Sequence, residues 1–272
     1  GRQSRSCRTA YAGRGCAAGA RGCGSTDRHE AIDVVLRYPV QGVLPANRHP
    51  ARQGQGIRAA GYGQAGDDQF YGDGGNDIFS GSAGEDFAIG GLGDDRLIGS
   101  SDTDYMYGSS GRDYLDGGAG SDFLGGVFLG RDDSDNEAGD DVIIGGTGND
   151  QISGGAGNDF IQGGEGDDAL WGDYQSDSLV SGNADQIYGD GGNDQIFGQW
   201  NEGDGRYASD TSGDELHGGD GDDLIEGSGG RDYLSGDAGD DSIFGLSGNA
   251  TIFGRTGDDF LSGDSGHDIV YG

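Results

Sequence analysis

The sequence predicts an all-β protein whose main part is a right-handed parallel β-roll, a β-solenoid of about ten 18-residue coils. Three observations support this prediction. A nine-residue pattern begins at Gly63 and recurs twenty times up to Tyr271. Every unit has an apolar residue at the same position, and a glycine-rich run separates one apolar residue from the next. A fixed short period of this kind indicates a repeat architecture with one supersecondary unit per repeat.

The pattern is clearest in Gly145–Trp171, which reads GGTGNDQIS, GGAGNDFIQ, GGEGDDALW. Position 1 is Gly in all twenty units, position 8 is apolar in all twenty, and position 6 is Asp in nineteen, with Ala250 as the exception. Position 4 is Gly in seventeen units, and the exceptions are Asp102, Asn183 and Ser212. Three units are lengthened: 126–144, 172–188 and 198–217.

Each unit combines a turn with a short strand. The six residues GGxGxD favour a tight turn, because Gly adopts positive φ angles without steric cost. The three residues x-apolar-x predict a minimal strand, in which position 8 points inward and positions 7 and 9 point outward. One turn and one strand reverse the chain, so two units close a coil of 18 residues. Stacked coils then pair their strands into two parallel sheets with a line of turns along each edge.

The charge divides the chain into two parts. Residues 1–62 contain ten Arg against three acidic residues, whereas residues 63–272 contain six Arg against 46 acidic residues, and the whole chain has a net charge of −33. We expect two regions: an irregular, Arg/Gly-rich leader or remnant over 1–62 and the β-roll over 63–272. The leader is either poorly ordered or a small cap on the first coil. The acidic repeats exclude nucleic acid as a partner, because phosphates would be repelled, and they favour cations.

The sequence shows no sign of a membrane span, a signal peptide or a cysteine-based metal or disulfide framework. No apolar run approaches the length of a membrane span, and the N-terminus shows no apolar segment typical of a signal peptide. Cys7, Cys16 and Cys23 all precede the repeats, and their spacing fits neither a CxxC metal site nor a paired disulfide framework.

The chemistry of the repeat favours Ca²⁺. The apolar core is thin, and stacking the coils places Asp next to Asp along each edge, so a cation must neutralise these carboxylates and hold the turns. Calcium takes six to eight oxygen ligands from carboxylates and main-chain carbonyls, and the repeat supplies both. Softer metals are disfavoured, because only His217 and His267 occur in the repeats and Cys is absent there.

The units resemble the haemolysin-type calcium-binding repeat, the RTX nonapeptide GGxGxDxUx, over residues 63–271. The resemblance implies a parallel β-roll with Ca²⁺ between successive turns, at most about 18 ions in all. The implied carboxylate ligands are Asp68, Asp77, Asp86, Asp95, Asp104, Asp113, Asp122, Asp141, Asp150, Asp159, Asp168, Asp185, Asp194, Asp214, Asp223, Asp232, Asp241, Asp259 and Asp268. The implied carbonyl donors lie at or beside Gly66, Gly75, Gly84, Gly93, Gly111, Gly120, Gly146, Gly148, Gly155, Gly157, Gly164, Gly166, Gly192, Gly219, Gly221, Gly230, Gly239, Gly257 and Gly266. Ala250 removes one carboxylate, so we expect sites that touch the unit 245–253 to be weak or empty.

The three lengthened units all have even numbers in the series, so we expect their extra residues to leave the roll from one edge. These extra segments are 128–137, 174–181 and 200–210. They are either tolerated loop growth or a lateral surface that binds a protein, a polysaccharide or further cations. The aromatic and aliphatic residues at position 9 should pack cross-strand on the outside of the sheets, or form a docking face.

We interpret the chain as a calcium-binding and folding module, not an enzyme, of a secreted, extracellular bacterial protein of the type I secretion class. His29 and Glu30 begin an HExxH-like motif, but its second His is replaced by Asp33, so a zinc-protease site is not formed. Two alternatives stay open: the tail of a secreted protease, lipase or polysaccharide epimerase, and an adhesin-type array.

Overall fold

The structure is a computed structural model that describes residues 58–126, 139–175, 183–201 and 212–272. All of these residues belong to one compact unit, Ile32–Gly272. The second unit, Gly1–Ala31, lies outside the described residues.

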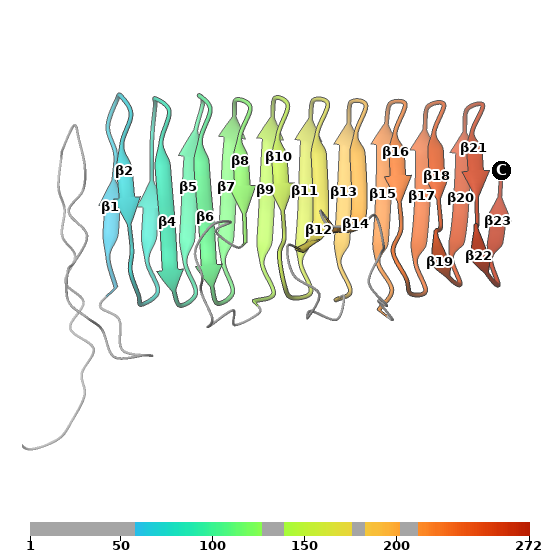
Figure 1. Cartoon of the computed structure of the whole chain (residues 1–272). Helices are drawn as coiled ribbons and strands as arrows, with labels where there is room; N and C mark the ends of the chain where they lie inside the picture. The colour runs from blue at the N-terminus through green and yellow to red at the C-terminus, as the bar shows by residue number, and fades with distance from the viewer. Residues whose placement is uncertain (1–57, 127–138, 176–182, 202–211) are drawn as a thin grey trace, which may run out of the picture. The chain divides into compact units, whose positions relative to one another are not determined.

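The described chain forms two long parallel sheets in which successive strands alternate (Figure 1). The eleven-stranded sheet contains β1 (Ala60–Tyr62), β3 (Ile78–Ser80), β5 (Arg96–Ser100), β7 (Tyr114–Ala119), β9 (Val142–Thr147), β11 (Phe160–Glu165), β13 (Gln186–Gly191), β15 (Glu215–Asp220), β17 (Tyr233–Ala238), β20 (Thr251–Thr256) and β23 (Ile269–Tyr271). The ten-stranded sheet contains β2 (Gln69–Tyr71), β4 (Phe87–Leu92), β6 (Tyr105–Ser110), β8 (Phe123–Gly125), β10 (Gln151–Ser153), β12 (Ala169–Gln175), β14 (Gln195–Asn201), β16 (Leu224–Glu226), β18 (Ser242–Phe244) and β21 (Phe260–Ser262). The alternation confirms the predicted parallel β-roll.

The register of the strands confirms that two units make one coil. Ile78 pairs with Arg96 and Ser242 pairs with Phe260, so equivalent residues are 18 positions apart. Across the lengthened units the same pairing continues with a larger offset, as in Tyr114 with Val142. The extra residues therefore leave the ladder without shifting its register, which keeps each apolar residue on the core side.

Many strands are longer than the three residues that the pattern predicts. Strand β4 runs over six residues, Phe87–Leu92, and therefore continues through positions 1 to 3 of the next unit. The prediction was too short because Gly-Gly-x was assigned wholly to the turn. In the stacked coils these residues also pair: Gly91 lies opposite Ser109 and Leu92 opposite Ser110. Short pairing occurs even within turns, where β19 (Ser247–Gly248) meets β22 (Ser265–Gly266).

The first strand lies before the predicted start of the roll. Strand β1 pairs in parallel with β3, and Gly61 of β1 lies opposite the buried Phe79. The strand ladder therefore begins at Ala60, three residues before the first repeat unit. The pattern did not show this strand because Gly61 occupies the position where every later unit has an apolar side chain.

The core consists of the position-8 side chains of both sheets, which stack in layers along the roll. From Phe70 to Ile252 these side chains are 0–3% exposed. Ala88, the smallest side chain of this set, is fully buried between Phe70 and Met106 of the neighbouring strands. The outward rings at positions 7 and 9 pack cross-strand as expected; for example, the centroids of Tyr188 and His217 are 4.8 Å apart.

The turns form two lines, one along each edge of the roll. We call the turns that lead from the eleven-stranded to the ten-stranded sheet the plain edge; they begin at Gly63, Gly81, Gly99, Gly117, Gly145, Gly163, Gly189, Gly218, Gly236 and Gly254. The opposite turns form the insertion edge; they begin at Gly72, Gly90, Gly108, Gly126, Gly154, Gly172, Gly198, Gly227, Gly245 and Gly263. All three lengthened units belong to the insertion edge, which confirms their shared side. Apart from the ends of β12 and β14, the inserted segments 128–137, 174–181 and 200–210 lie outside the described residues.

Candidate metal-binding turns

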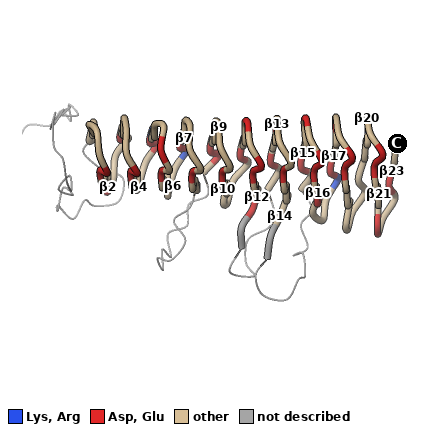
Figure 2. Tube along the Cα trace, turned by 90° about the horizontal axis from the view of Figure 1, so that it is seen from above, with Lys and Arg blue, Asp and Glu red and all other residues tan. Residues whose placement is uncertain are grey.

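From Asp68 to Asp241 the Asp residues at position 6 form one buried column inside each edge, and acidic residues recur in coil after coil (Figure 2). From Asp77 to Asp268, one carboxylate oxygen of each of these residues joins two coils. The backbone N–H of Asp68 donates to Oδ1 of Asp86, 2.8 Å away, and the N–H of Asp95 donates in the same way to Asp113. The bond recurs across the lengthened units, as from Asp113 to Asp141 at 2.7 Å. Oδ1 therefore holds the turn of the preceding coil, a structural role that the sequence pattern did not reveal.

The second carboxylate oxygen of most of these residues is buried without a hydrogen-bond partner. This holds for Oδ2 of Asp77, Asp86, Asp95, Asp104, Asp113, Asp122, Asp150, Asp159, Asp168, Asp185, Asp194, Asp223 and Asp241. A buried polar atom without a partner costs free energy, and a buried charge costs more. The same unsatisfied atom at the same place in so many coils therefore points to a missing charged partner.

The position-1 glycine of these turns leaves room for the oxygen because it has no Cβ atom. A Cβ atom placed on Gly99 would overlap Oδ2 of Asp104 and would lie 2.6 Å from the carbonyl oxygen of Gly117, one coil further on. We call this space the cradle of a turn; it is flanked by the Asp Oδ2 of that turn and the position-1 carbonyl oxygen of the next coil. The same pair of oxygens flanks the cradles at Gly63, Gly72, Gly90, Gly117, Gly126, Gly145, Gly163, Gly172, Gly189 and Gly218. Gly is required at position 1 because any side chain would fill the cradle.

The turn conformation explains the other glycines. Position 2 adopts a positive φ in many turns even where it is not Gly, as at Asp73 (68°) and Ser109 (84°). Position 4 also has a positive φ, as at Gly93 (120°). Every glycine that we expect to place a carbonyl near an ion has a positive φ, with the single exception of Gly230 among these described residues. Such consecutive reversals turn peptide groups toward the interior of the loop.

Burial raises the pKa of these carboxyl groups. Desolvation is the largest cause throughout, and it is opposed by the hydrogen bond from the preceding coil. The pKa rises to about 6 for Asp104, to about 8 for Asp95 and to about 9 for Asp141. For Asp185 desolvation and the charges of Asp159 and Asp173 raise the pKa to about 10. Without a cation the folded state therefore favours neutral carboxyl groups.

The donor set fits a hard cation that is bound mainly by oxygen. Within the described ranges, no three His, Cys, Asp or Glu side chains converge on one point. An ion in a cradle must therefore combine one carboxylate oxygen with main-chain carbonyls, which suits Ca²⁺ and excludes thiolate or imidazole ligation. Asp77, Asp141 and the other cradle carboxylates would hold such an ion, and the ion would supply the positive charge that the buried oxygens lack.

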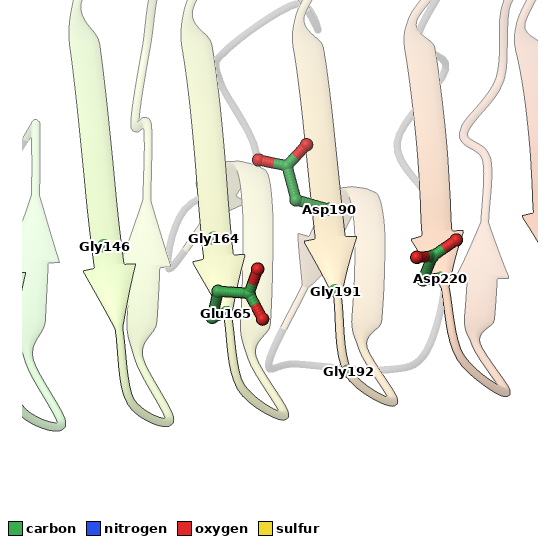
Figure 3. A pocket seen from close by; sticks show the side chains of 7 residues that line it. All are labelled: Gly146, Gly164, Glu165, Asp190, Gly191, Gly192 and Asp220. Atoms are coloured by element: carbon green, nitrogen blue, oxygen red, sulfur yellow. The ribbon is translucent and has the colours of Figure 1, made fainter.

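A separate acidic groove of about 630 Å³ lies on the outside of the plain edge (Figure 3). Gly146, Gly164, Gly191 and Gly192 line it together with the carboxylates of Glu165, Asp190 and Asp220. The three carboxylates stand on successive strands, and Gln162 Nε2 donates to Asp190 Oδ2 at 2.6 Å. The groove is hollow because glycines form its floor, and its acids do not share a common point.

One turn departs from the pattern as expected and another does so unexpectedly. Ala250 places a methyl group where the cradle of Gly245 would need a carboxylate oxygen, in agreement with the sequence. The unexpected case is Ser228, whose buried hydroxyl donates to Oδ2 of Asp214 at 2.8 Å. The signal for it was present in the sequence as a Ser at position 2, but Ser82 occupies the same position in another turn and is exposed.

A parallel β-roll whose turns bury carboxylate oxygens beside main-chain carbonyls belongs to the class of cation-binding repeat proteins. The chain matches the family described as RTX calcium-binding nonapeptide repeat (4 copies) over residues 61–88, 89–124, 135–170, 153–183, 180–201, 210–243, 217–252 and 244–272. These matches cover most of the sequence, and the chain belongs to the RTX calcium-binding repeat family. No curated protein matched the chain in the same comparisons. Among the described residues, no helix is long and apolar enough to cross a membrane.

Proposed function

We propose that this chain is a calcium-dependent folding module, without catalytic activity of its own, of a protein exported from a bacterial cell. The observation that carries the proposal is the repeated buried Oδ2, which lacks a hydrogen-bond partner at the same place in most turns. Each such oxygen destabilises the ion-free roll and becomes a ligand when Ca²⁺ is present. Because the unfolded chain does not assemble the cradles, calcium binds the folded state and stabilises it by mass action.

Export would move the chain from low to high calcium and would therefore trigger folding. Extracellular calcium sites typically have dissociation constants of about 10⁻⁴–10⁻³ M, well above cytosolic calcium levels. The excess of acids in residues 63–272 keeps the ion-free chain open by self-repulsion. We therefore place the folding step outside the cell, where calcium is abundant. The membership in the RTX family supports this proposal, as does the absence of a cluster of His or Cys side chains from the part of the chain that the structure describes.

A calcium titration followed by circular dichroism tests the proposal. In a chelator at neutral pH the chain should give the spectrum of an unfolded polypeptide, and millimolar CaCl₂ should convert it to a β spectrum in a cooperative transition. MgCl₂ at the same concentration is the matched control, because Mg²⁺ retains its water and demands near-octahedral geometry. A β spectrum that is already complete in chelator at neutral pH would refute the proposed coupling.

A further inference from the structure

The insertion edge contains three consecutive turns that differ from the rest. They begin at Gly198, Gly227 and Gly245, and their position-6 residues are Asp214, Asp232 and Ala250. On the same edge Asp77, Asp95, Asp113, Asp159 and Asp185 keep a buried Oδ2 without a hydrogen-bond partner. In the three differing turns the corresponding oxygen is either bonded to protein or absent.

Ser228 belongs to the turn that begins at Gly227, and its side chain reaches the turn of the preceding coil, which begins at Gly198. Its side chain is fully buried, and its hydroxyl donates to Oδ2 of Asp214 at 2.8 Å. The backbone N–H of the same residue donates to Oδ2 of Asp232 at 3.0 Å. One serine thus satisfies the cradle oxygens of two successive turns. The third turn has no oxygen to satisfy, because Ala250 replaces the Asp.

The backbone of the turn that contains Ser228 is also different. Neither Ser228 nor Gly230 has the positive φ that positions 2 and 4 adopt in many other turns, such as 84° at Ser109 and 122° at Gly111. A Cβ atom placed on Gly198 would lie 3.5 Å from the carbonyl carbon of Gly227, and the oxygen of that carbonyl is farther away still. In the cradle of Gly163 the equivalent oxygen, that of Gly189, lies within 2.9 Å. The second flanking oxygen has therefore turned away from this cradle.

We propose that the Ser228 hydroxyl and N–H replace calcium in the cradles of Asp214 and Asp232, so that the insertion edge binds no ion from Gly198 to Ala250. This inference rests on the proposed function and refines it. The plain edge continues its line of cradle carboxylates through Asp194, Asp223 and Asp241 in the same coils. The two edges therefore bind different numbers of ions, and one short segment of the roll is held by hydrogen bonds instead of metal.

Ser228→Gly tests the proposal by restoring the residue that the repeat carries at position 2 in turns such as that of Gly155. The matched control is Ser109→Gly, also at position 2 of the insertion edge, where the serine has a positive φ and its N–H donates to the carbonyl oxygen of Gly126. Bound calcium per chain is measured by equilibrium dialysis of the full chain in millimolar CaCl₂. We expect Ser228→Gly to bind about one more ion than the wild type, and Ser109→Gly to bind the same number. An unchanged count in Ser228→Gly would overturn the proposal.

A second pair of variants does not depend on how well Ser228→Gly folds. Asp159→Asn alters an insertion-edge cradle with a free Oδ2, whereas Asp214→Asn alters the cradle that Ser228 closes. Asp159→Asn should lower the count by about one ion and Asp214→Asn should leave it unchanged. An equal loss in both variants would overturn the proposal while leaving the calcium function intact. If the wild type itself bound no calcium, the proposed function would fail together with this inference.

Discussion

At the scale of single residues, the Asp at position 6 performs two tasks with its two oxygens. Oδ1 accepts a hydrogen bond from the coil before it, as Asp104 does from Asp86 at 2.8 Å. Oδ2 of the same residue stays buried beside the cradle without a partner. The carboxylate therefore fixes the stacking of the coils and also leaves an oxygen available for a cation. An Asn could keep the first function but not the charge of the second.

The position-1 glycine is predicted to be irreplaceable because the cradle lies directly against its Cα. Gly99→Ala should overlap Oδ2 of Asp104 and crowd the carbonyl oxygen of Gly117, which is 2.6 Å from the added methyl group. Overpacking of this kind typically costs about 1–3 kcal/mol, and here it also displaces the cation. Denaturant unfolding in millimolar calcium measures the loss.

Gly191→Ala is the control for this substitution. Gly191 has an ordinary φ, and the nearest atom to an added Cβ, Glu165 Oε2, is 3.6 Å away. This variant should unfold at the same denaturant concentration as the wild type. Equal stability of the Gly99 and Gly191 variants would contradict the description of the cradle.

At the scale of the elements, a strand such as β7 contributes a single fully buried side chain to the core. Leu115 of β7 is 0% exposed and pairs with Leu97 and Ile143 on either side. Each interior strand of a sheet is paired with a strand on either side. The backbone therefore cannot move inward to fill a cavity left by a smaller side chain without breaking these pairs. The core is thin but rigidly packed.

Leu115→Ala should therefore be costly despite the small core. Large-to-small substitutions at buried leucines cost about 2–5 kcal/mol, and the limited scope for collapse here favours the upper part of that range. Chemical denaturation in saturating calcium measures the change. Thr147→Ala, at an exposed position of the neighbouring strand β9, should change stability by less than about 0.5 kcal/mol. A negligible effect of Leu115→Ala would show that the core does not support the roll.

The elements also show what could be predicted from sequence. The period placed the inward side chains from Phe70 to Ile252, because a side chain that must point inward in every coil has to be apolar. The strand extension through Gly91 and Leu92 was missed, since glycine gives no inward or outward signal. Strand β1 was missed for the same reason at Gly61.

The candidate site was only partly predictable. The pattern identified the Asp residues but could not tell which oxygen bonds the preceding coil and which is left for a cation. That assignment depends on where the preceding coil places its N–H. Ser228 and Ser109 have the same residue type at the same position, yet only Ser228 is buried against a cradle carboxylate. The difference lies in the backbone conformation of the turn, which the pattern does not specify.

At the scale of the whole molecule, the buried carboxyl groups make the stability of the ion-free roll depend on pH. Their pKa values rise from the model-compound value of 3.8 to about 6 for Asp86, about 7 for Asp77 and about 8 for Asp95, chiefly through burial. An acid whose pKa is raised in the folded state contributes stability below its unfolded pKa. That contribution is lost as the pH rises through the folded value.

In chelator, the chain should therefore be most structured near pH 4 and should lose β structure progressively as the pH rises toward the raised pKa values, such as about 6 for Asp86 and about 7 for Asp77, so that little remains at neutral pH. Calcium should abolish this loss, because it holds the ionised carboxylates, and its affinity should fall on acidification as protons compete. Circular dichroism across pH, with and without CaCl₂, measures both effects. An ion-free β signal that increases with pH would have the opposite sign and would contradict the assignment.

The most direct test of the central claim is X-ray diffraction from crystals grown in millimolar CaCl₂, with anomalous scattering used to locate the ions. Calcium should lie in the cradles between the Asp Oδ2 of one turn and the position-1 carbonyl of the next, as beside Asp104 and Gly117. Both edges should contain such ions, and the turns of Asp214, Asp232 and Ala250 should not. Intact coils whose cradles contain no metal under these conditions would contradict the account.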